Sequence, residues 1–475
     1  MNDRSVLDAD HLSETDRREI HDASLRILSD TGVEVGLADA RELLADHGAD
    51  VDGDVVRVPP ALVEDALDSA PESFTWHARN PDNDVAVGGS DGETVFAPAY
   101  GASNVLTVDG TRRSSTRSDY ERLLKLVQQA DAVTSTGYTV CEVGDCSAEA
   151  KPYEMTSRSL LYSDKPVMGD TFGRERAEVS LDLTGIAVED RDLSKPYVAG
   201  QITPVSPRRL SGHMAGGLLA YAERGQPLVF ASVVMAGATG PATLAGAFAL
   251  ANAEVLFAIT LAQLAHEGVP VVYGAPATTF DMHATTMASG SPEGALATAF
   301  TGQMADFYGL PARAGGCLTD AKTVDDQAGS ESMQHLLTTL AADVDVVVHA
   351  AGMLEAYATV SPVKFVLDCE RIATARRLQD GYEVSEKTLA LDLVTGIEPG
   401  GDFLSERHTV TNVREEHFMP DLADRSSHDD WERDGSPTAA DRGRERVEAW
   451  LEEYERPPIP DDVEAAIEEY VDEGP

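Results

Sequence analysis

The stretch GGCLTDAKTVDDQAGSES, residues 315–332, gathers residue types that can do acid–base or nucleophilic chemistry. Its candidate catalytic residues are Asp320 and Lys322, and its candidate substrate-binding residues are Asp326, Gln327 and Glu331. A lysine can form a Schiff base or clamp a phosphate, but nearby carboxylates keep its amine charged and make it a poor nucleophile. Two interpretations stay open: a polar loop in which Lys322 orients its neighbours around a ligand, and a purely structural ion pair.

A histidine, His349, lies inside the apolar run VDVVVHAAG, which is typical of a buried strand. A histidine in such a run is often a hydrogen-bonded core residue. At the end of a strand, by contrast, its neutral imidazole can donate one hydrogen bond and accept another near pH 7. We therefore count His349 as a third candidate catalytic residue, with the core role as the alternative.

The sequence lacks the motifs of common metal and nucleotide sites. HExxH, paired CxxC and GxxxxGK[ST] do not occur. The stretch DMHATT, residues 281–286, resembles the D-x-H-x-x-G motif of corrinoid-carrying domains, but it ends in Thr286 where that motif has glycine. We interpret it as a chance match and predict no bound metal.

The charge of the chain argues against several classes of partner. Lys and Arg number 37 against 82 Asp and Glu, which gives a formal charge of −45. Such a field repels nucleic acids and anionic membrane surfaces, so we expect neither as a partner. Acidic residues in every section of the chain favour a high-salt cytoplasm, where salt screens the self-repulsion, over an ordinary acidic protein. Four cysteines without a CxxC pair, and an N-terminus without an apolar core, indicate a cytoplasmic protein.

The elements that must position these residues alternate regularly along the chain. Eight strands are predicted at NVLTVD, AVTSTGYTV, KPVMGDTF, PYVAGQITPV, QPLVFASVVM, VPVVYGAPA, LPARAGGCLTD and VDVVVHAAG. Helices are predicted between them at about 118–130, 150–163, 174–188, 208–224, 241–267, 292–308 and 327–342. The long apolar helix carries Asn252, Glu254 and Gln263, so we expect it to be a buried helix and not a membrane span.

Strict alternation of strand and helix predicts an α/β protein, a (β/α)8 TIM-type barrel more than an open sheet. We expect a small N-terminal α+β lobe at 1–98, the barrel at 99–382 and an acidic helical C-terminal extension at 383–475. Reactive groups of such barrels lie at the C-terminal ends of the strands. Those ends carry Tyr138, Asp170, Phe172, Gln201, Tyr273, Cys317, Thr319, Asp320 and His349.

Several segments together resemble the trimethylamine methyltransferase family. They are IHDASLRILSDTGVEV, HGADVDGDVVRVPPALVEDAL, GATGPATLAGAFALANAEVLFAITLAQL, SPEGALATAFTGQMADFYGLPAR, GGCLTDAKTVDDQAGSES and DRSSHDDW, in order from about residue 11 to 440. The resemblance implies a β/α barrel that passes a methyl group from a methylated amine to the cobalt(I) of a separate corrinoid protein. It would explain a site without its own nucleophile, because the corrinoid cofactor is supplied by the partner and no cofactor is bound tightly by this chain.

One departure from the family narrows the substrate. Members that use trimethylamine carry pyrrolysine, whereas this chain has only the twenty standard residues, which favours quaternary amines such as glycine betaine. The resemblance then suggests Tyr138, Phe172, Tyr273 and Tyr100 as aromatic faces for a quaternary ammonium. A carboxylate on the substrate would need Lys322, His349 or Arg313.

The alternatives to this hypothesis belong to different classes. Trimethylamine itself is one substrate alternative. A metal-dependent barrel lyase or hydrolase would use Asp320, His349 and Asp281, and a non-catalytic protein would only bind a betaine and a corrinoid protein. For the protein itself we expect a homo-oligomer.

Overall fold

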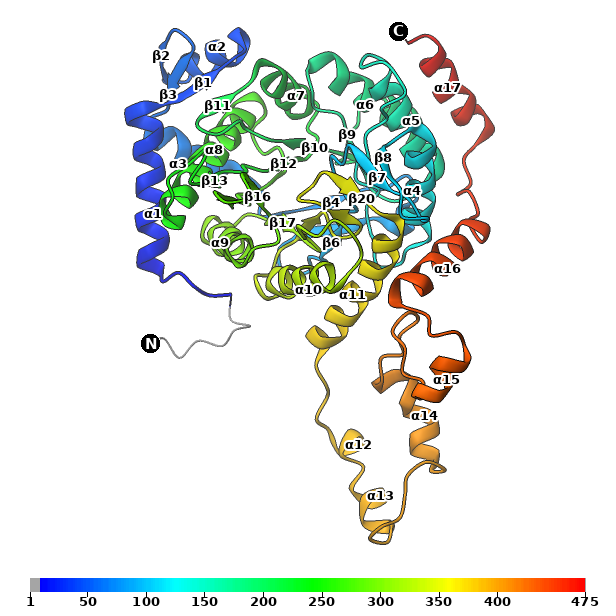
Figure 1. Ribbon diagram of the computed structural model, residues 1–475. Coiled ribbons are helices and arrows are strands. Elements are labelled where there is room, and N and C mark those ends of the chain that lie inside the picture. The colour runs from blue at the N-terminus through cyan, green and yellow to red at the C-terminus, as the bar shows by residue number, and fades with distance from the viewer. Residues whose placement is uncertain (1–8, 475) are drawn as a thin grey trace.

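The computed structural model describes residues 9–474 and shows an α/β protein whose parallel strands lie at the centre with helices around them (Figure 1). The chain begins with α1 (Glu14–Arg26), a π-helical turn η1 (Ile27–Thr31), β1 (Val33–Val35), α2 (Ala38–Asp46), β2 (Asp50–Asp52), β3 (Val55–Arg57) and α3 (Pro60–Ser69). The side chain of Ser13 caps α1, because its hydroxyl accepts from the backbone of Asp16. β2 pairs antiparallel with β3 across a turn at Gly53, so the two strands form a hairpin.

Seven short parallel strands form the centre of the alternating part of the chain. They are β6 (Val95–Phe96), β9 (Val167–Gly169), β10 (Val198–Ile202), β12 (Leu228–Phe230), β14 (Val271–Val272), β17 (Arg313–Gly315) and β18 (Val346–Val348). The helices of this part are α4 (Arg117–Gln129), α5 (Lys151–Tyr162), α6 (Arg174–Ala187), α7 (Gly212–Glu223), α8 (Leu244–Ala265), α9 (Pro292–Tyr308), α10 (Asp326–Ala341) and α11 (Pro362–Asp380). Each predicted helix therefore overlaps a helix of the structure.

The parallel strands form two sheets and not one continuous closed sheet. One has the order β14-β12-β10-β9 and the other β17-β18-β6. A parallel bridge between Tyr273 and Ala312 links them on one side. On the other side Gly137 bridges to Val167, and the backbone of Thr134 donates to Phe96.

The first predicted strand is present but lies outside the central parallel sheets. NVLTVD contains β7 (Asn104–Leu106), but this strand belongs to a separate sheet with β8 (Arg112–Ser114), β19 (Met353–Leu354) and β20 (Thr359–Val360). The strand that pairs with β18 is β6, which is fully buried, as central parallel strands are. NVLTVD is only half-buried and is followed by an Asp-Gly turn, which are the properties of a hairpin strand. In the second predicted strand, AVTSTGYTV, only Gly137 makes a ladder contact.

Smaller strands connect the N-terminal part to this centre. They are β4 (Ser73–Trp76), β5 (Val85–Gly88), β11 (Arg209–Leu210), β13 (Met235–Ala236), β15 (Thr278–Asp281) and β16 (Thr286–Ala288), with a 3-10 turn η2 (Pro81–Asn83). β11 pairs with β1, so the N-terminal sheet includes a strand from the middle of the chain. β6 also lies before the expected boundary at residue 98, so the parallel strands take in the end of the first segment.

Helix α8 is apolar on all sides and is the one helix of residues 9–474 that is long and apolar enough to cross a membrane. Most of it is buried inside the protein, against α1, α3 and α7. Its polar residues are bonded there: Asn252 donates to Ser24 and Tyr308. It is therefore built as a core helix, as the sequence predicted.

The C-terminal part consists of α12 (Glu386–Leu389), α13 (Leu391–Gly396), α14 (Arg407–Glu416), α15 (His428–Arg433), α16 (Ala439–Glu452) and α17 (Asp461–Asp472). α16 packs on α11 and α4, and α17 packs on α5 and α6. The segment from α12 to α14 instead extends away from the body (Figure 1), and no residue from 381 to 420 is buried. It exposes several large apolar side chains, including Tyr382, Val384, Leu391, Leu404 and Met419.

Candidate functional site

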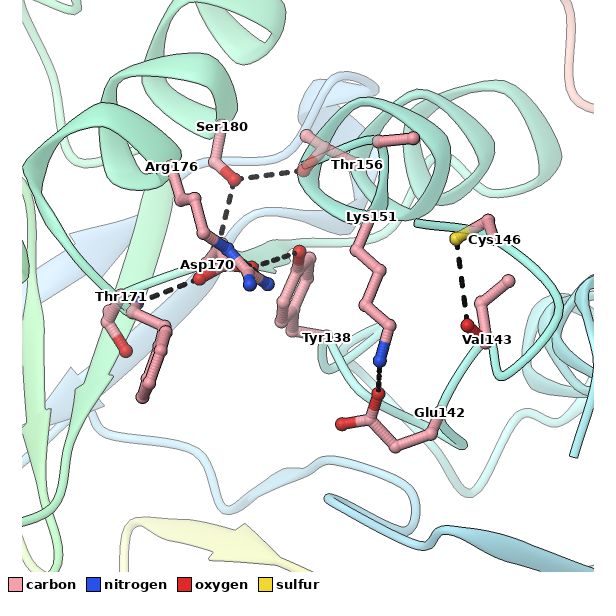
Figure 2. Close-up of polar contacts among 12 residues, drawn as sticks. Tyr138, Glu142, Val143, Cys146, Lys151, Thr156, Asp170, Thr171, Arg176 and Ser180 are labelled. Carbon is pink, nitrogen blue, oxygen red and sulfur yellow. Dashed lines mark hydrogen bonds and ion pairs between the residues drawn. The ribbon is translucent and has the colours of Figure 1, made fainter. Parts of the chain in front are cut away.

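The carboxylate of Asp170, directly after β9, is the centre of a buried polar cluster (Figure 2). Its Oδ2 accepts from the hydroxyl of Tyr138 at 2.9 Å and from Nε of Arg176 at 3.0 Å, and it makes a shorter contact with Nη2 of Arg176. Its Oδ1 accepts from the backbone N–H of Phe172 at 2.8 Å. Burial, and next the charge of Asp170, raise the pKa of Tyr138, so this phenol stays a donor. Sequence reasoning gave Asp170 and Tyr138 and missed Arg176, whose signal is its position in the first turn of the helix after Asp170.

Hydrogen bonds from the helices fix the backbone of this loop. The N–H of Asp170 donates to the hydroxyl of Ser180 on α6 at 2.9 Å, and that hydroxyl bonds Thr156 on α5 at 2.9 Å. Figure 2 shows a second ion pair nearby, in which Lys151 faces Glu142. Asp170 is therefore held in one position by Tyr138 and by two residues of α6, Arg176 and Ser180.

Phe172 lies at the surface beside this cluster, with 51% of its area exposed. Its ring stacks on His213 with centroids 4.6 Å apart, and the guanidinium of Arg176 lies over its face at 5.6 Å. Phe172, His213 and Arg176 line a cleft of about 660 Å³ at the N-terminal ends of α6 and α7. The cleft therefore borders the Asp170 cluster on its solvent side.

A second group of polar residues surrounds Arg313, the first residue of β17. Arg313 is 3% exposed, and its Nη2 donates to the side-chain carbonyl of Gln201 on β10 at 3.3 Å. Its Nε is buried without a hydrogen-bond partner. Burial lowers the pKa of Arg313 to about 10, which still leaves it charged at neutral pH.

His349 follows β18 and adopts a positive φ of 61°, which is uncommon outside glycine. Its Nδ1 accepts from the backbone N–H of Tyr100 at 3.3 Å, so the proton of the neutral ring is on Nε2. The rings of Tyr100 and Tyr357 flank it at centroid distances of 6.3 and 4.7 Å. Burial, and next the charge of Arg313, lower the pKa of His349 well below 6.5, so the ring is neutral at physiological pH. Tyr357 gave no sequence signal, because it lies in an irregular loop of positive-φ residues.

The structure places Tyr273 away from the residues it was grouped with. Its hydroxyl donates to Asn252 on α8 at 2.7 Å, and its ring packs against Tyr308 on α9. Successive side chains of a strand point to opposite faces, and Val272 packs with Val229 of the next strand on the inner face. Tyr273 therefore faces the helices, and we remove it from the candidate site.

The predicted loop after β17 is a network that satisfies its own hydrogen bonds. The carboxylate of Asp320 accepts from the N–H and hydroxyl of Ser289 and from the N–H of Gly290, at 2.8–3.0 Å. Glu331 accepts from the hydroxyl of Thr319 and the N–H of Asp320, and Gln327 donates to it at 2.8 Å. Lys322 is exposed and donates only to the backbone carbonyl of Asp320, at 2.6 Å, and Asp326 is exposed in the first turn of α10. These contacts therefore support a structural role for the polar side chains, which brace the loop by hydrogen bonds.

Replacing Asp320 by alanine should lower the free energy of unfolding by about 1–3 kcal/mol, because it leaves two backbone donors of the 289–290 segment without their acceptor. Lys322→Ala is the matched control: it removes one bond from an exposed side chain and should leave the denaturation midpoint unchanged. Urea unfolding followed by fluorescence measures both. Equal midpoints for the two variants would contradict the bracing role of Asp320.

The metal-enzyme alternative finds no support in the described residues 9–474, which contain no group of three or more His, Cys, Asp or Glu arranged to hold a metal ion. Asp281 is exposed in the β15–β16 hairpin, where its carboxylate accepts from the backbone of His283 and Ala284. These are the bonds of a local turn.

Comparison with known proteins gives one family over nearly the whole chain. The sequence matches the family profile described as trimethylamine methyltransferase over residues 3–474. A glycine betaine methyltransferase of Desulfitobacterium hafniense is 38% identical over 97% of this chain and 96% of its own length. A trimethylamine methyltransferase from another strain of that species is 31% identical over 96% of this chain and 92% of its own length. The crystal structure of the Methanosarcina barkeri monomethylamine methyltransferase has the same fold, with a TM-score of 0.57 at 10% identity over 95% of this chain and 90% of the other.

Proposed function

The chain belongs to the trimethylamine methyltransferase family, and from this premise we propose that it transfers a methyl group from a quaternary amine of the glycine betaine type to the cobalt(I) of a separate corrinoid protein. The 38% identical relative that bears the name glycine betaine methyltransferase supports this substrate class. Trimethylamine is less well supported, because the chain lacks the pyrrolysine of the members that use it.

The observation that carries the proposal is the cluster of Tyr138, Asp170 and Tyr100. A quaternary ammonium cannot donate hydrogen bonds, so it is bound by aromatic faces and by negative charge. Asp170 lies close enough to Tyr100 and Tyr138 for its charge to raise the pKa of both phenols. Tyr100 and Tyr138 thus provide aromatic faces, and Asp170, which is also paired with Arg176, provides a carboxylate beside them.

The protein's own nucleophiles are poorly suited to take the methyl group. Burial raises the pKa of Cys141, Cys317 and Cys369, so these thiols stay protonated. Cobalt(I) supplies the electron pair instead: the N–CH₃ bond breaks, a Co–CH₃ bond forms, and the amine leaves as a neutral tertiary amine with the former bonding pair. The protein then needs only to bind the cation, shield it from water and align its methyl group.

We propose further that the parallel strands form a (β/α)8 barrel. The links at Tyr273–Ala312, Gly137–Val167 and Thr134–Phe96 support this, because they join the two sheets on both sides. The N-terminal lobe then ends before Val95, the barrel extends to about residue 382, and the C-terminal helical extension follows. With the catalytic cobalt on the partner, this chain needs no tightly bound cofactor.

The proposed partners follow from charge and surface. A chain of net charge −45 is suited to small cations and a corrinoid protein in the cytoplasm, not to nucleic acids or anionic membranes. The exposed apolar side chains between 381 and 420 are typical of a protein interface, which supports a homo-oligomer.

Purified protein, mixed with cob(I)alamin or a reduced corrinoid protein, should convert the cobalt(I) absorbance spectrum to that of methylcobalt(III) when glycine betaine is added. Trimethylamine and dimethylglycine are the comparison substrates and should react much more slowly. Methyl transfer from trimethylamine alone would favour the alternative substrate, and binding of betaine without any transfer would favour a non-catalytic binding protein.

The rate of methyl transfer should be constant between about pH 7 and pH 9, because no group of the proposed site titrates there. The pKa of His349 lies well below 6.5, those of Tyr100 and Tyr138 are raised, that of Tyr357 is about 12 and that of Arg313 about 10. Arg313 is charged below its pKa, so a loss of rate is expected only above about pH 10. Initial rates at constant ionic strength test this, and a bell-shaped profile centred near pH 7 would contradict it.

A further inference from the structure

Arg313 is a buried charge without an anionic partner. It is 3% exposed, it takes part in no ion pair within residues 9–474, and its Nε has no hydrogen-bond partner. Its single side-chain bond, to Gln201, is long at 3.3 Å. Buried charges are normally paired, as Lys364 is with Asp368 in the same protein. A guanidinium left in this state is complementary to an anion that comes from outside the chain.

The fold leaves space for the side chain of Arg313 and holds it across the centre of the sheet arrangement. β17 and β10 are separated by β14 and β12, so the contact between Arg313 and Gln201 spans two intervening strands. Gly274 lies beside it, and a Cβ at that position would come within 3.0 Å of the Cδ of Arg313. The same Cβ would lie only 2.2 Å from the backbone carbonyl oxygen of Phe230, so position 274 has room for glycine alone.

His349 adds a second donor near the same charge. Its Nδ1 is occupied by the N–H of Tyr100, so Nε2 carries the proton and has no bonded acceptor within the described part of the chain. Burial, and next the charge of Arg313, lower the pKa of His349. Both are donors, and neither has an anion to bind.

Tyr100 is near a negative charge as well as a positive one. This ring is affected by both Asp170 and Arg313, whose effects on its pKa oppose each other. The site thus combines aromatic faces at Tyr100 and Tyr138, beside the ion-paired carboxylate of Asp170, with an unpaired guanidinium at Arg313. A small zwitterion with a carboxylate close to a quaternary nitrogen matches both features, whereas a simple amine matches only the aromatic one.

We propose that Arg313, with the Nε2–H of His349, binds the carboxylate of an amino-acid betaine and so makes the enzyme selective for zwitterions over quaternary amines without a carboxylate. This inference rests on the proposed function and adds the residue that selects the substrate. Charge-assisted bonds to a carboxylate are directional, so the same contact would also fix the orientation of the N-methyl group relative to the acceptor.

Calorimetric binding of glycine betaine and of choline to the full-length protein tests the proposal without any corrinoid. Choline keeps the trimethylammonium group and replaces the carboxylate by a hydroxymethyl group. Wild-type protein should bind glycine betaine at least about tenfold more tightly than choline. Arg313→Met should remove that preference by weakening glycine betaine binding, and choline binding should stay the same or improve.

Arg313→Lys is the second variant and keeps the positive charge if the methionine variant does not fold; it should retain part of the preference. Equal affinities of wild-type protein for the two ligands, or equal weakening of both by Arg313→Met, would overturn the inference. The failure of the proposed function looks different: the wild-type protein would bind glycine betaine selectively and still transfer no methyl group to cobalt.

Discussion

Replacing Asp368 by alanine is expected to lower the free energy of unfolding by about 3–5 kcal/mol, because it leaves a fully buried lysine without its anion. Lys364 and Asp368 lie one turn apart on α11, both with no exposed side-chain area, and their charged atoms are 2.6 Å apart. Asp368 also accepts from Arg371 at 2.6 Å and from the N–H of Gly352 at 2.8 Å. One substitution thus removes the acceptor of three donors.

The same substitution should disturb the end of β17. The amine of Lys364 donates to the carbonyl of Cys317 at 3.0 Å and to the hydroxyl of Ser332 on α10 at 2.9 Å, so α11, α10 and the strand meet at this charge. Asp368→Asn, which keeps two polar atoms of similar shape, should cost less than Asp368→Ala. Chemical denaturation monitored by circular dichroism gives the midpoints.

Arg18→Ala is the matched control, because Arg18 and Glu14 form an ion pair of the same helical spacing with both side chains exposed. Its midpoint should equal that of the wild type. Salt separates the two cases further: the loss in Asp368→Ala should persist in molar KCl, because buried charges are screened little. An Asp368→Ala protein that unfolds at the wild-type midpoint would show that this buried network does not stabilise the fold.

The contrast between Lys322 and Lys364 shows what a sequence can and cannot predict about a charged residue. Lys322 was a candidate catalytic residue because it lies among carboxylates in the sequence, yet it is exposed and donates to one backbone carbonyl. Lys364 and Asp368 have the spacing of an ordinary surface pair on a helix. Their burial depends on α10 and β17 packing over that face of α11, which no local pattern contains.

The helices were predictable because their apolar spacing is local, and α9 begins and ends at the predicted residues. The pairing of the strands was less predictable from the sequence. Two apolar stretches, Val95–Phe96 and Asn104–Leu106, are each suitable in sequence as the strand beside β18. The structure shows that the first pairs with β18 and the second with β20. Asp109 and Gly110, which form a turn after the second stretch, were the local signal for a hairpin.

The candidate site was predictable where the rule of strand ends applies. Tyr138, Asp170, Phe172 and His349 follow parallel strands or lie beside them, and the structure brings Tyr138, Asp170 and Phe172 together in one cluster. Tyr273 lies apart from that cluster, against Asn252 and Tyr308, because the strand end was predicted without the face on which each side chain lies. The sequence could not show that Arg313 is buried without an ionic partner, because burial depends on the whole fold.

Replacing Asp170 by alanine is expected to lower kcat/KM for methyl transfer from glycine betaine about 100-fold, on the basis of the proposed function. The substitution removes the negative charge beside Tyr100 and Tyr138 and also frees three donors that Asp170 now holds. The aromatic face would then lose both its orientation and the charge that attracts the ammonium. Initial rates of methyl transfer, measured by spectrophotometry at several betaine concentrations, give kcat and KM separately.

Two further variants separate the charge of Asp170 from its role in positioning Tyr138. Tyr138→Phe keeps the ring and loses only the bond to Asp170, so its effect should be well under that of Asp170→Ala. Glu223→Gln removes one carboxylate charge from the bidentate pair that Arg174 forms at the edge of the same cleft, and it should leave the rate unchanged. If Glu223→Gln slows the reaction as much as Asp170→Ala does, net charge at the cleft is sufficient to explain the effect, and Asp170 has no specific role in binding the cation.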